Sequence, residues 1–192
     1  MAKRLIIGMS GASGAPLTVE LLRQLHDHHP EIETHLIVTK GGEMTFSQER
    51  GMTLEDLKKL TTVWHSNSNI GAAPASGSFR TMGMIVVPCS MKTVAGIVSG
   101  YSDNLLLRAA DVVMKERRKL VLVAREAPFS TVHLRNLYEI SQLGAVVLPP
   151  MLTYYNHPQS LEDCTRHTVN RILSQFDLDE GSYQWEGMDE NI

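Results

Sequence analysis

Five apolar runs, with helical patterns between them, most limit how this chain can fold. The runs span Leu5–Met9, Thr34–Val38, Met84–Val87, Leu120–Val123 and Ala145–Leu148. Short apolar runs that alternate with helices are typical of a parallel sheet whose strands are buried on both faces. The sequence therefore predicts an α/β fold of the flavodoxin-like (Rossmann-like) type, a three-layer sandwich around a mostly parallel sheet.

The predicted helices lie between and after these runs. Their ranges are 17–25, 42–48, 54–63, 105–114 and 132–143, and a last helix carries apolar positions every three or four residues from Leu161 to Phe176. Asp103 or Asn104 is expected to cap the fourth of these helices, and Gly144 to end the fifth. The stretch TTVWHSNSNIGAAPASGSFR is predicted to be a long loop.

Length and composition narrow the class of protein. The 192 residues suit one domain, taken as 1–178, with an acidic tail at 179–192. The net charge of −3 argues against a nucleic-acid-binding protein. The two cysteines lie far apart without zinc-site spacing, which favours a reducing cytoplasm. The N-terminal apolar run of about five residues is too short for a signal peptide, and no run approaches the roughly 20 residues of a membrane span.

Small residues connect the first strand to the first helix. Gly8, Gly11 and Gly14 have the spacing G-x-x-G-x-x-G, which matches neither the dinucleotide motif nor the Walker motif. Bare backbone at a helix N-terminus attracts anions, above all phosphate. Thr39 and Lys40 end the second strand where an NAD site would place an acidic residue, so a different ligand such as FMN is indicated. The alternative is a glycine turn that only permits close packing.

Polar residues also follow the later strands. Ser90, Lys92 and Thr93 follow the third, and Arg125-Glu126 follow the fourth. Cations that converge at this edge would form a phosphate clamp without metal. In the ordinary alternative, Arg108 pairs with Asp111 and the other charges are solvated. No HExxH motif or pair of carboxylates has metal-ligand spacing, so no metal is predicted.

With these residues assembled, the chain resembles the UbiX-like flavin prenyltransferases, the Pad-type partners of aromatic acid decarboxylases. The resemblance covers nearly the whole chain. It rests on GMSGASGAP, PASGS, PCSMKT, the block NLLLRAADVVMKERRKLVLVAREAPFSTVHLRN, GAVVLPPMLTYYNHP and VNRIL. The long central block makes the resemblance specific, which the glycine turn alone would not do.

The resemblance implies roles for individual residues. The FMN site would comprise Ser10, Gly11, Ala12, Ser13, Thr39, Ser90, Met91, Lys92, Thr93 and Arg125. The phosphate of dimethylallyl monophosphate would be held by Lys115, Tyr155 and Arg171, with Arg125 or Ser90 assisting. Glu49 and Glu126 match family acids near the reacting centre, where Ser13 and Ser90 are also expected.

The resemblance also implies the reaction and the partners. Reduced FMN would receive a prenyl group at N5 and C6, giving the prenylated cofactor that UbiD-type decarboxylases use. Arg125 would reach into a neighbouring subunit, so we expect a homo-oligomer, and the family suggests a dodecamer.

Two departures and three alternatives accompany this interpretation. Ile70 stands where the family often has a tryptophan, and Trp185 in the tail is a candidate cover for the site. An FMN-dependent decarboxylase of the cysteine type lacks support because the expected asparagine after Met151 is absent. A direct aromatic acid decarboxylase would need a group that stabilises a carbanion. A non-catalytic FMN carrier would not need a second phosphate site.

Overall fold

A six-stranded parallel sheet forms the centre of the protein. The computed structural model describes residues 3–179, 183, 185 and 187. The strands lie in the order β3-β2-β1-β4-β5-β6, and every pairing between neighbours is parallel. Their bounds are β1 (Lys3–Met9), β2 (Ile32–Val38), β3 (Val63–Ser66), β4 (Gly83–Cys89), β5 (Lys119–Ala124) and β6 (Val146–Val147). The predicted flavodoxin-like sheet is confirmed.

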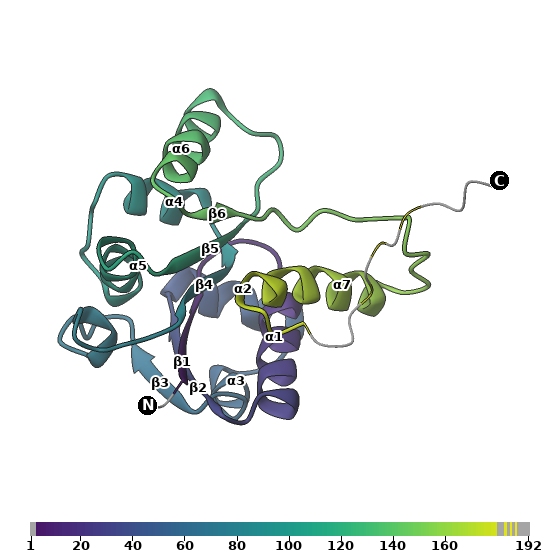
Figure 1. The fold of residues 1–192 in the computed structure, drawn as a ribbon, viewed down its shortest axis with the longest axis horizontal. Helices are drawn as coiled ribbons and strands as arrows, with labels where there is room; N and C mark the ends of the chain where they lie inside the picture. Colours follow the sequence, from purple (N-terminus) through teal and green to yellow (C-terminus); the bar gives the residue numbers. More distant parts are fainter. Residues whose placement is uncertain (1–2, 180–182, 184, 186, 188–192) are drawn as a thin grey trace.

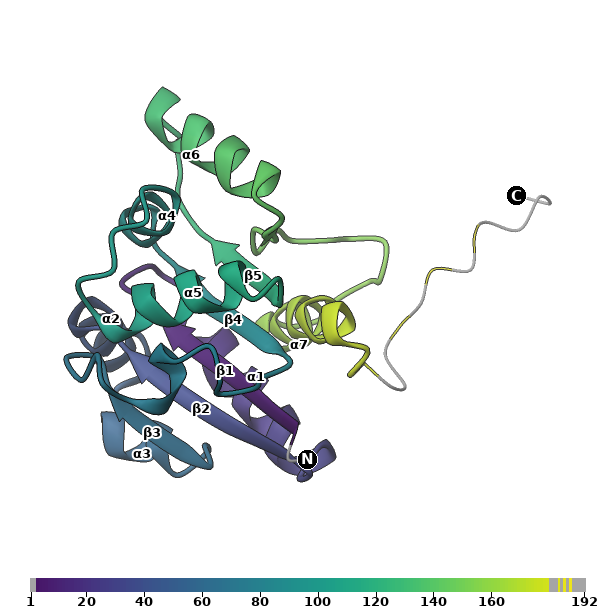
Figure 2. The ribbon, with the colours of Figure 1, turned by 60° about the vertical axis from the view of Figure 1, so that its left-hand side comes forward.

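Helices cover both faces of this sheet (Figures 1 and 2). One apolar core includes residues of α1 (Ala15–His28), α2 (Lys40–Arg50), α3 (Leu54–Lys58) and α7 (Leu161–Leu173). The opposite core includes residues of α4 (Met91–Val98), α5 (Leu105–Lys115) and α6 (Thr131–Gln142). Two short 3-10 turns, Ala73–Ala75 and Ser174–Phe176, complete the described elements.

Strand periodicity explains why two cores form. Successive side chains of a strand point to opposite faces, so Leu5 and Ile7 join the core that contains α1 whereas Ile6 joins the core that contains α5. The apolar runs read from the sequence are therefore strands buried on both sides. Local chemistry also fixes the helix ends. The Asn104 side chain caps α5 by accepting from the Leu107 N–H at 3.1 Å, and Asn104 is one of the two residues predicted as this cap.

Three elements differ from the sequence prediction. β3 lies inside the stretch predicted to be a loop. The strand was missed because it has only four residues, of which His65 and Ser66 are polar, and because it pairs with β2 alone. α4 was not predicted, since its residues MKTVAGIV follow the strand almost directly and resemble its continuation. The predicted helix over 54–63 ends at Lys58, and Val63 begins β3.

The strand order locates the ligand edge. The chain proceeds from β1 outward to β2 and β3, then returns to place β4 on the other side of β1. Such a reversal leaves a crevice outside the carboxyl ends of the two central strands, where open α/β sheets bind ligands. The loops after β1 and β4 meet there. Across the described chain, none of the helices combines the length and hydrophobicity that a membrane span requires.

Candidate active site

Ser10 joins the loops that follow β1 and β4. It is almost fully buried, and its hydroxyl donates to the Pro88 carbonyl at 3.2 Å and accepts from the Ser90 N–H at 2.8 Å. The Ser10 N–H also donates to the Pro88 carbonyl, at 3.1 Å. The side chain of this predicted FMN contact is therefore occupied in holding two rim loops together. Gly11 and Ser13, which follow it, are exposed.

A cradle without side chains lies between the loops after β1 and β2. A Cβ atom at Gly11 would come within 3.1 Å of the Gly41 backbone, and a Cβ at Gly42 would meet the Met9 carbonyl oxygen at 2.6 Å. Glycine is thus required for the close approach of the two loops. Thr39 caps α2 by accepting from the Gly42 N–H at 3.0 Å. The first turn of α2 therefore has glycine at two of its four positions, Gly41 and Gly42, between Lys40 and Glu43.

Glu49 occupies the N-terminus of the first helix, α1. One oxygen of its carboxylate accepts from the Gly14 N–H at 3.1 Å and from the Ala15 N–H at 2.8 Å. These N–H groups belong to the helix end that the sequence suggested for phosphate. A carboxylate at a helix N-terminus is stabilised by the unpaired donors and by the helix dipole. The N–H groups of Gly14 and Ala15 are therefore already paired with an acceptor.

Ser90 caps α4 at the same rim. Its hydroxyl accepts from the Thr93 N–H at 3.3 Å and lies 3.1 Å from the Thr93 hydroxyl. Met91 and Thr93 are buried, whereas Lys92 is exposed. The neighbouring Cys89 is fully buried, and burial raises the pKa of its thiol. Cys89 is thus a small core residue and not a nucleophile.

Arg125 and Glu126 follow β5 at the carboxyl edge of the sheet. The Arg125 N–H donates to the Cys89 carbonyl at 3.1 Å, which fixes the backbone beside the β4 loop. Arg125, Ser13 and Glu49 line one groove of about 790 Å³ next to α1 and α7. Glu126 accepts from the Ala127 N–H at 3.0 Å. The structure therefore brings three of the predicted residues together in a single groove.

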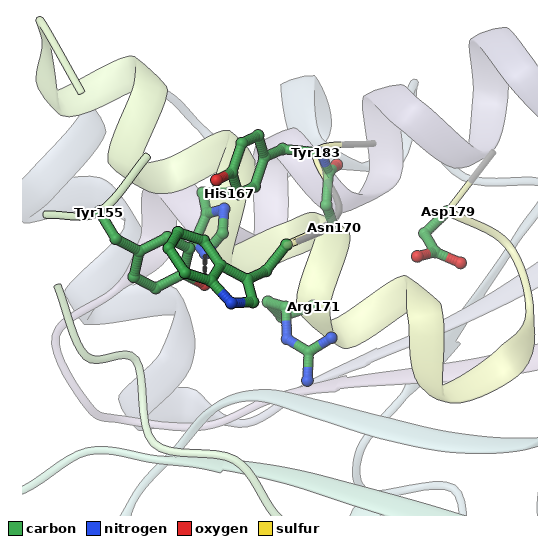
Figure 3. Close-up of a pocket in the computed structure, with 7 residues that line it drawn as sticks. Tyr155, His167, Asn170, Arg171, Asp179 and Tyr183 are labelled. Carbon is green, nitrogen blue, oxygen red and sulfur yellow. Dashed lines mark hydrogen bonds between the residues drawn. The ribbon is translucent and has the colours of Figure 1, made fainter. Parts of the chain in front are cut away.

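A second pocket, of about 380 Å³, contains two predicted phosphate ligands (Figure 3). Tyr155 and Arg171 both line it, together with His167, Asn170, Asp179, Tyr183 and Trp185. The Tyr155 ring lies 5.7 Å from the Trp185 ring and 5.9 Å from the Tyr183 ring, measured between centroids. Tyr183 and Trp185 thus lie directly against Tyr155. Trp185 is the tail residue that the sequence offered as a cover for the site.

Lys115 lies near the amino end of β5, whereas Arg125 lies at its carboxyl end. It ends α5 and precedes β5, and its ammonium group pairs with Glu116 next to Gly77. The six residues of β5 lie between the two, and at about 3.3 Å per residue the strand spans roughly 20 Å. Among the described residues, the groove of Arg125 and the pocket of Tyr155 also share no lining residue. One chain therefore holds the predicted phosphate clamp in separate parts.

Arg108 takes the structural role that the sequence left open for it, as the partner of Asp111. Arg108 pairs with Asp111 at 2.5 Å and donates to the Ala75 carbonyl at 3.3 Å, so this cation supports a loop. Ile70 is 57% exposed. Within the described part of the chain, no three His, Cys, Asp or Glu side chains gather as metal ligands.

Two functional features escaped the sequence prediction. The bond between Glu49 and α1 joins residues 34 positions apart, and no local pattern signals it. His167 lies 3.3 Å from the Tyr155 hydroxyl. The only signal for His167 in the sequence is its position four residues before Arg171, on the same helical face.

Comparison with known proteins identifies the family. A family model described as Flavoprotein matches residues 1–173. A "Probable UbiX-like flavin prenyltransferase" of Sedimentibacter hydroxybenzoicus is 51% identical over 185 residues, covering 96% of this chain and 97% of that protein. This chain belongs to the UbiX-like flavin prenyltransferase family. The predicted flavoprotein character and enzyme class are thereby confirmed.

Two solved structures of the UbiX-like family support the same assignment. A dodecameric FMN-dependent UbiX-like decarboxylase from Escherichia coli O157:H7 is 49% identical, with a TM-score of 0.93 over 96% of this chain and 100% of that one. AnUbiX (PadA1), in complex with FMN and dimethylallyl pyrophosphate, is 44% identical, with a TM-score of 0.94 over 98% and 100% of the two chains. FMN as the cofactor of this chain agrees with both.

Proposed function

We propose that this protein joins the dimethylallyl group of dimethylallyl monophosphate to N5 and C6 of reduced FMN. The product would be the prenylated FMN that a UbiD-type decarboxylase uses. The observation that carries the proposal is a second pocket, lined by Tyr155 and Arg171, apart from the glycine cradle. Storage of flavin alone would require only the cradle.

The FMN phosphate is best accommodated at the N-terminus of α2. Gly11 and Gly41 leave no side chain between the two loops there, Lys40 begins the helix, and Thr39 already accepts from the Gly42 N–H. Glu49 already satisfies the first donors of α1, so a phosphate at that helix would meet a negative charge. Gly11, Ala12 and Ser13 then line one side of the bound nucleotide.

The flavin ring system would extend from this phosphate along the loops after β4 and β5. Ser90 caps α4, the first turn of α4 contains Met91, Lys92 and Thr93, and Arg125 directly follows β5. Ser10 contributes by joining the β1 and β4 loops and so fixes the width of the crevice. When bound, reduced FMN supplies the nucleophilic N5 and C6 positions.

The phosphate clamp must stabilise charge on a departing phosphate while the allyl group gains positive charge. Fixed cations and hydroxyl donors aimed at the leaving group lower that barrier without metal. Aromatic rings can stabilise the allyl cation through cation–π attraction. The phosphate, retained by Lys115, Tyr155 and Arg171, would remain available as an acid or base for the protons that N5 and C6 release when the new bonds form, so no histidine base is required.

Carboxylates and hydroxyls beside the flavin would handle the remaining proton transfers. Glu49 and Ser13 line the same groove as Arg125, and Ser90 lies on the neighbouring loop. Glu126 directly follows Arg125. We propose that these four residues, Glu49, Ser13, Ser90 and Glu126, lie around the reacting centre, with Glu49 also fixing the first turn of α1.

The separation of Lys115 from Arg125 and from the Tyr155 pocket implies that the clamp is completed between subunits. Subunits related by symmetry can present different edges of the same fold to one ligand. We therefore propose a homo-oligomer, with a dodecamer as the expected form since a UbiX-like relative is dodecameric.

The test is prenylation of FMN in the absence of added metal. Purified protein is mixed with reduced FMN and dimethylallyl monophosphate, and the flavin is weighed by mass spectrometry. A prenyl-sized mass gain is expected for the wild type and for Lys59→Ala, a control at the exposed lysine that follows α3. Lys115→Ala and Arg171→Ala should lose it while remaining folded. Unmodified FMN with the wild-type protein would refute the proposal and favour an FMN carrier or a decarboxylase.

A further inference from the structure

His167 contacts the hydroxyl of Tyr155 in the second pocket (Figure 3). The distance from His167 Nε2 to Tyr155 Oη is 3.3 Å. The two rings meet edge to face, with centroids 5.8 Å apart and an interplanar angle of 82°. His167 lies on α7 one turn before Arg171, so both side chains project from the same side of that helix.

We infer that His167 is a positioning residue, which holds the Tyr155 hydroxyl so that it can donate to the phosphate bound by Arg171. This inference rests on the proposed prenyl transfer, in which Tyr155 and Arg171 bind the phosphate of the substrate. It concerns the direction of one hydroxyl group, and it assigns no proton transfer to His167.

Tyr155 requires such support because its local backbone provides little. It lies in the segment between β6 and α7, which has neither helix nor strand, and its side chain is 45% exposed. A phenol hydroxyl has one proton to donate and two lone pairs that accept. If His167 donates from Nε2 to the phenol oxygen, the hydroxyl proton remains free for a phosphate oxygen.

The charge state of His167 is compatible with this role. Burial lowers the pKa of His167, and the nearby Arg171 guanidinium lowers it further. The imidazole is therefore neutral near pH 7 and carries one N–H, while Arg171 supplies the positive charge that binds the phosphate. Tyr183, Trp185 and Asp179 also line this pocket. Neutral His167 thus acts through the geometry of its hydrogen bond and not through its charge.

The edge-to-face contact offers a competing explanation, in which His167 only packs against the Tyr155 ring. Two substitutions of His167 distinguish packing against the ring from the hydrogen bond to the hydroxyl. His167→Phe keeps an aromatic ring at the contact but removes the hydrogen bond. His167→Gln removes the ring but retains an amide N–H that can reach the phenol oxygen.

The experiment is calorimetric titration of dimethylallyl monophosphate into the holoenzyme that contains oxidised FMN, which requires no turnover. His167→Phe and His167→Gln are compared in the wild-type and Tyr155→Phe backgrounds, with His26→Phe as a control at an exposed position of α1. We expect Kd to rise about three- to tenfold in His167→Phe, the usual effect of one lost hydrogen bond, and to stay within about twofold of wild type in His167→Gln. In the Tyr155→Phe background, neither substitution should weaken binding further.

Two results would overturn the inference. One is an unchanged Kd in His167→Phe, and the other is an equal loss of affinity in the presence and absence of the Tyr155 hydroxyl. Failure of the proposed function would look different, since the wild-type protein would then form no prenylated FMN in the assay with reduced FMN, or would not bind dimethylallyl monophosphate in the titration.

Discussion

At the scale of single residues, Glu49 most changes the picture obtained from the sequence. Its carboxylate accepts from two N–H groups at the start of α1, a role that no local pattern predicts. The same residue lines the groove with Ser13 and Arg125. Glu49 therefore combines a structural bond with a position beside the proposed reacting centre, and the two contributions can be measured separately.

Loss of the Glu49 carboxylate should destabilise the flavin-free protein. Glu49→Ala removes the acceptor for both α1 donors, which costs about 1–2 kcal/mol of unfolding free energy. The midpoint of thermal unfolding should fall by about 2–8 °C at fixed protein concentration. Glu49→Gln retains a carbonyl acceptor and should lose less than half as much. Circular dichroism can follow both variants, and equal midpoints for Glu49→Ala and wild type would contradict the assigned bond.

Residue types at the ends of strands could be predicted, but their partners could not. Ser90, Thr39 and Arg125 were placed at the ligand edge because they directly follow apolar runs. The hydrogen bonds that join Ser10 with Pro88 and Ser90 depend on how the loops approach one another in space. The same holds for the contact between His167 and Tyr155. Such contacts join residues that are distant in the sequence, and no periodicity reports them.

At the scale of elements, β3 is the strand that sequence reasoning missed. It pairs only with β2, at the edge of the sheet. His65 on β3 and His35 on β2 lie side by side, with 2.8 Å between His65 Nε2 and His35 Nδ1 and with stacked rings. Glu33 contacts the other nitrogen of His35 at 3.0 Å and also pairs with Arg4. Contacts between polar side chains, and not an apolar run, therefore hold β3 against β2.

The histidine pair should make stability depend on pH. Burial lowers the pKa of His35, although Glu33 opposes that effect, and burial also lowers the pKa of His65. Both values lie below about 6.5, the value expected in the unfolded chain. Unfolding therefore takes up protons as the pH falls below about 6.5, and the stability present above that pH is progressively lost.

We expect the thermal midpoint of the wild type to fall between pH 7 and pH 5. Only one proton fits between two nitrogens 2.8 Å apart, so His65→Asn should remove part of this slope. Circular dichroism melts at several pH values would measure it. A slope in His65→Asn that equals the wild-type slope would show that the pair does not control stability in this range.

At the scale of the whole molecule, the sheet separates the residues proposed to bind one phosphate. Lys115 lies before β5, Arg125 after it, and Tyr155 with Arg171 beside α7. Large apolar side chains are also exposed on α6, where Val132, Leu134 and Tyr138 are each more than half exposed. Exposed apolar faces of this kind mark interaction surfaces. Both observations favour a protein that works as an assembly.

Mixed assemblies of two inactive variants test prenyl transfer at sites shared between subunits. Lys115→Ala and Arg171→Ala chains, each inactive alone, would be co-expressed and purified as mixed oligomers, and prenylated FMN would be quantified by mass spectrometry. If Lys115 and Arg171 reach one ligand from different subunits, random mixing leaves about a quarter of the sites intact, and about a quarter of the wild-type activity should return. Mixed oligomers that stay inactive would contradict a clamp built from two chains.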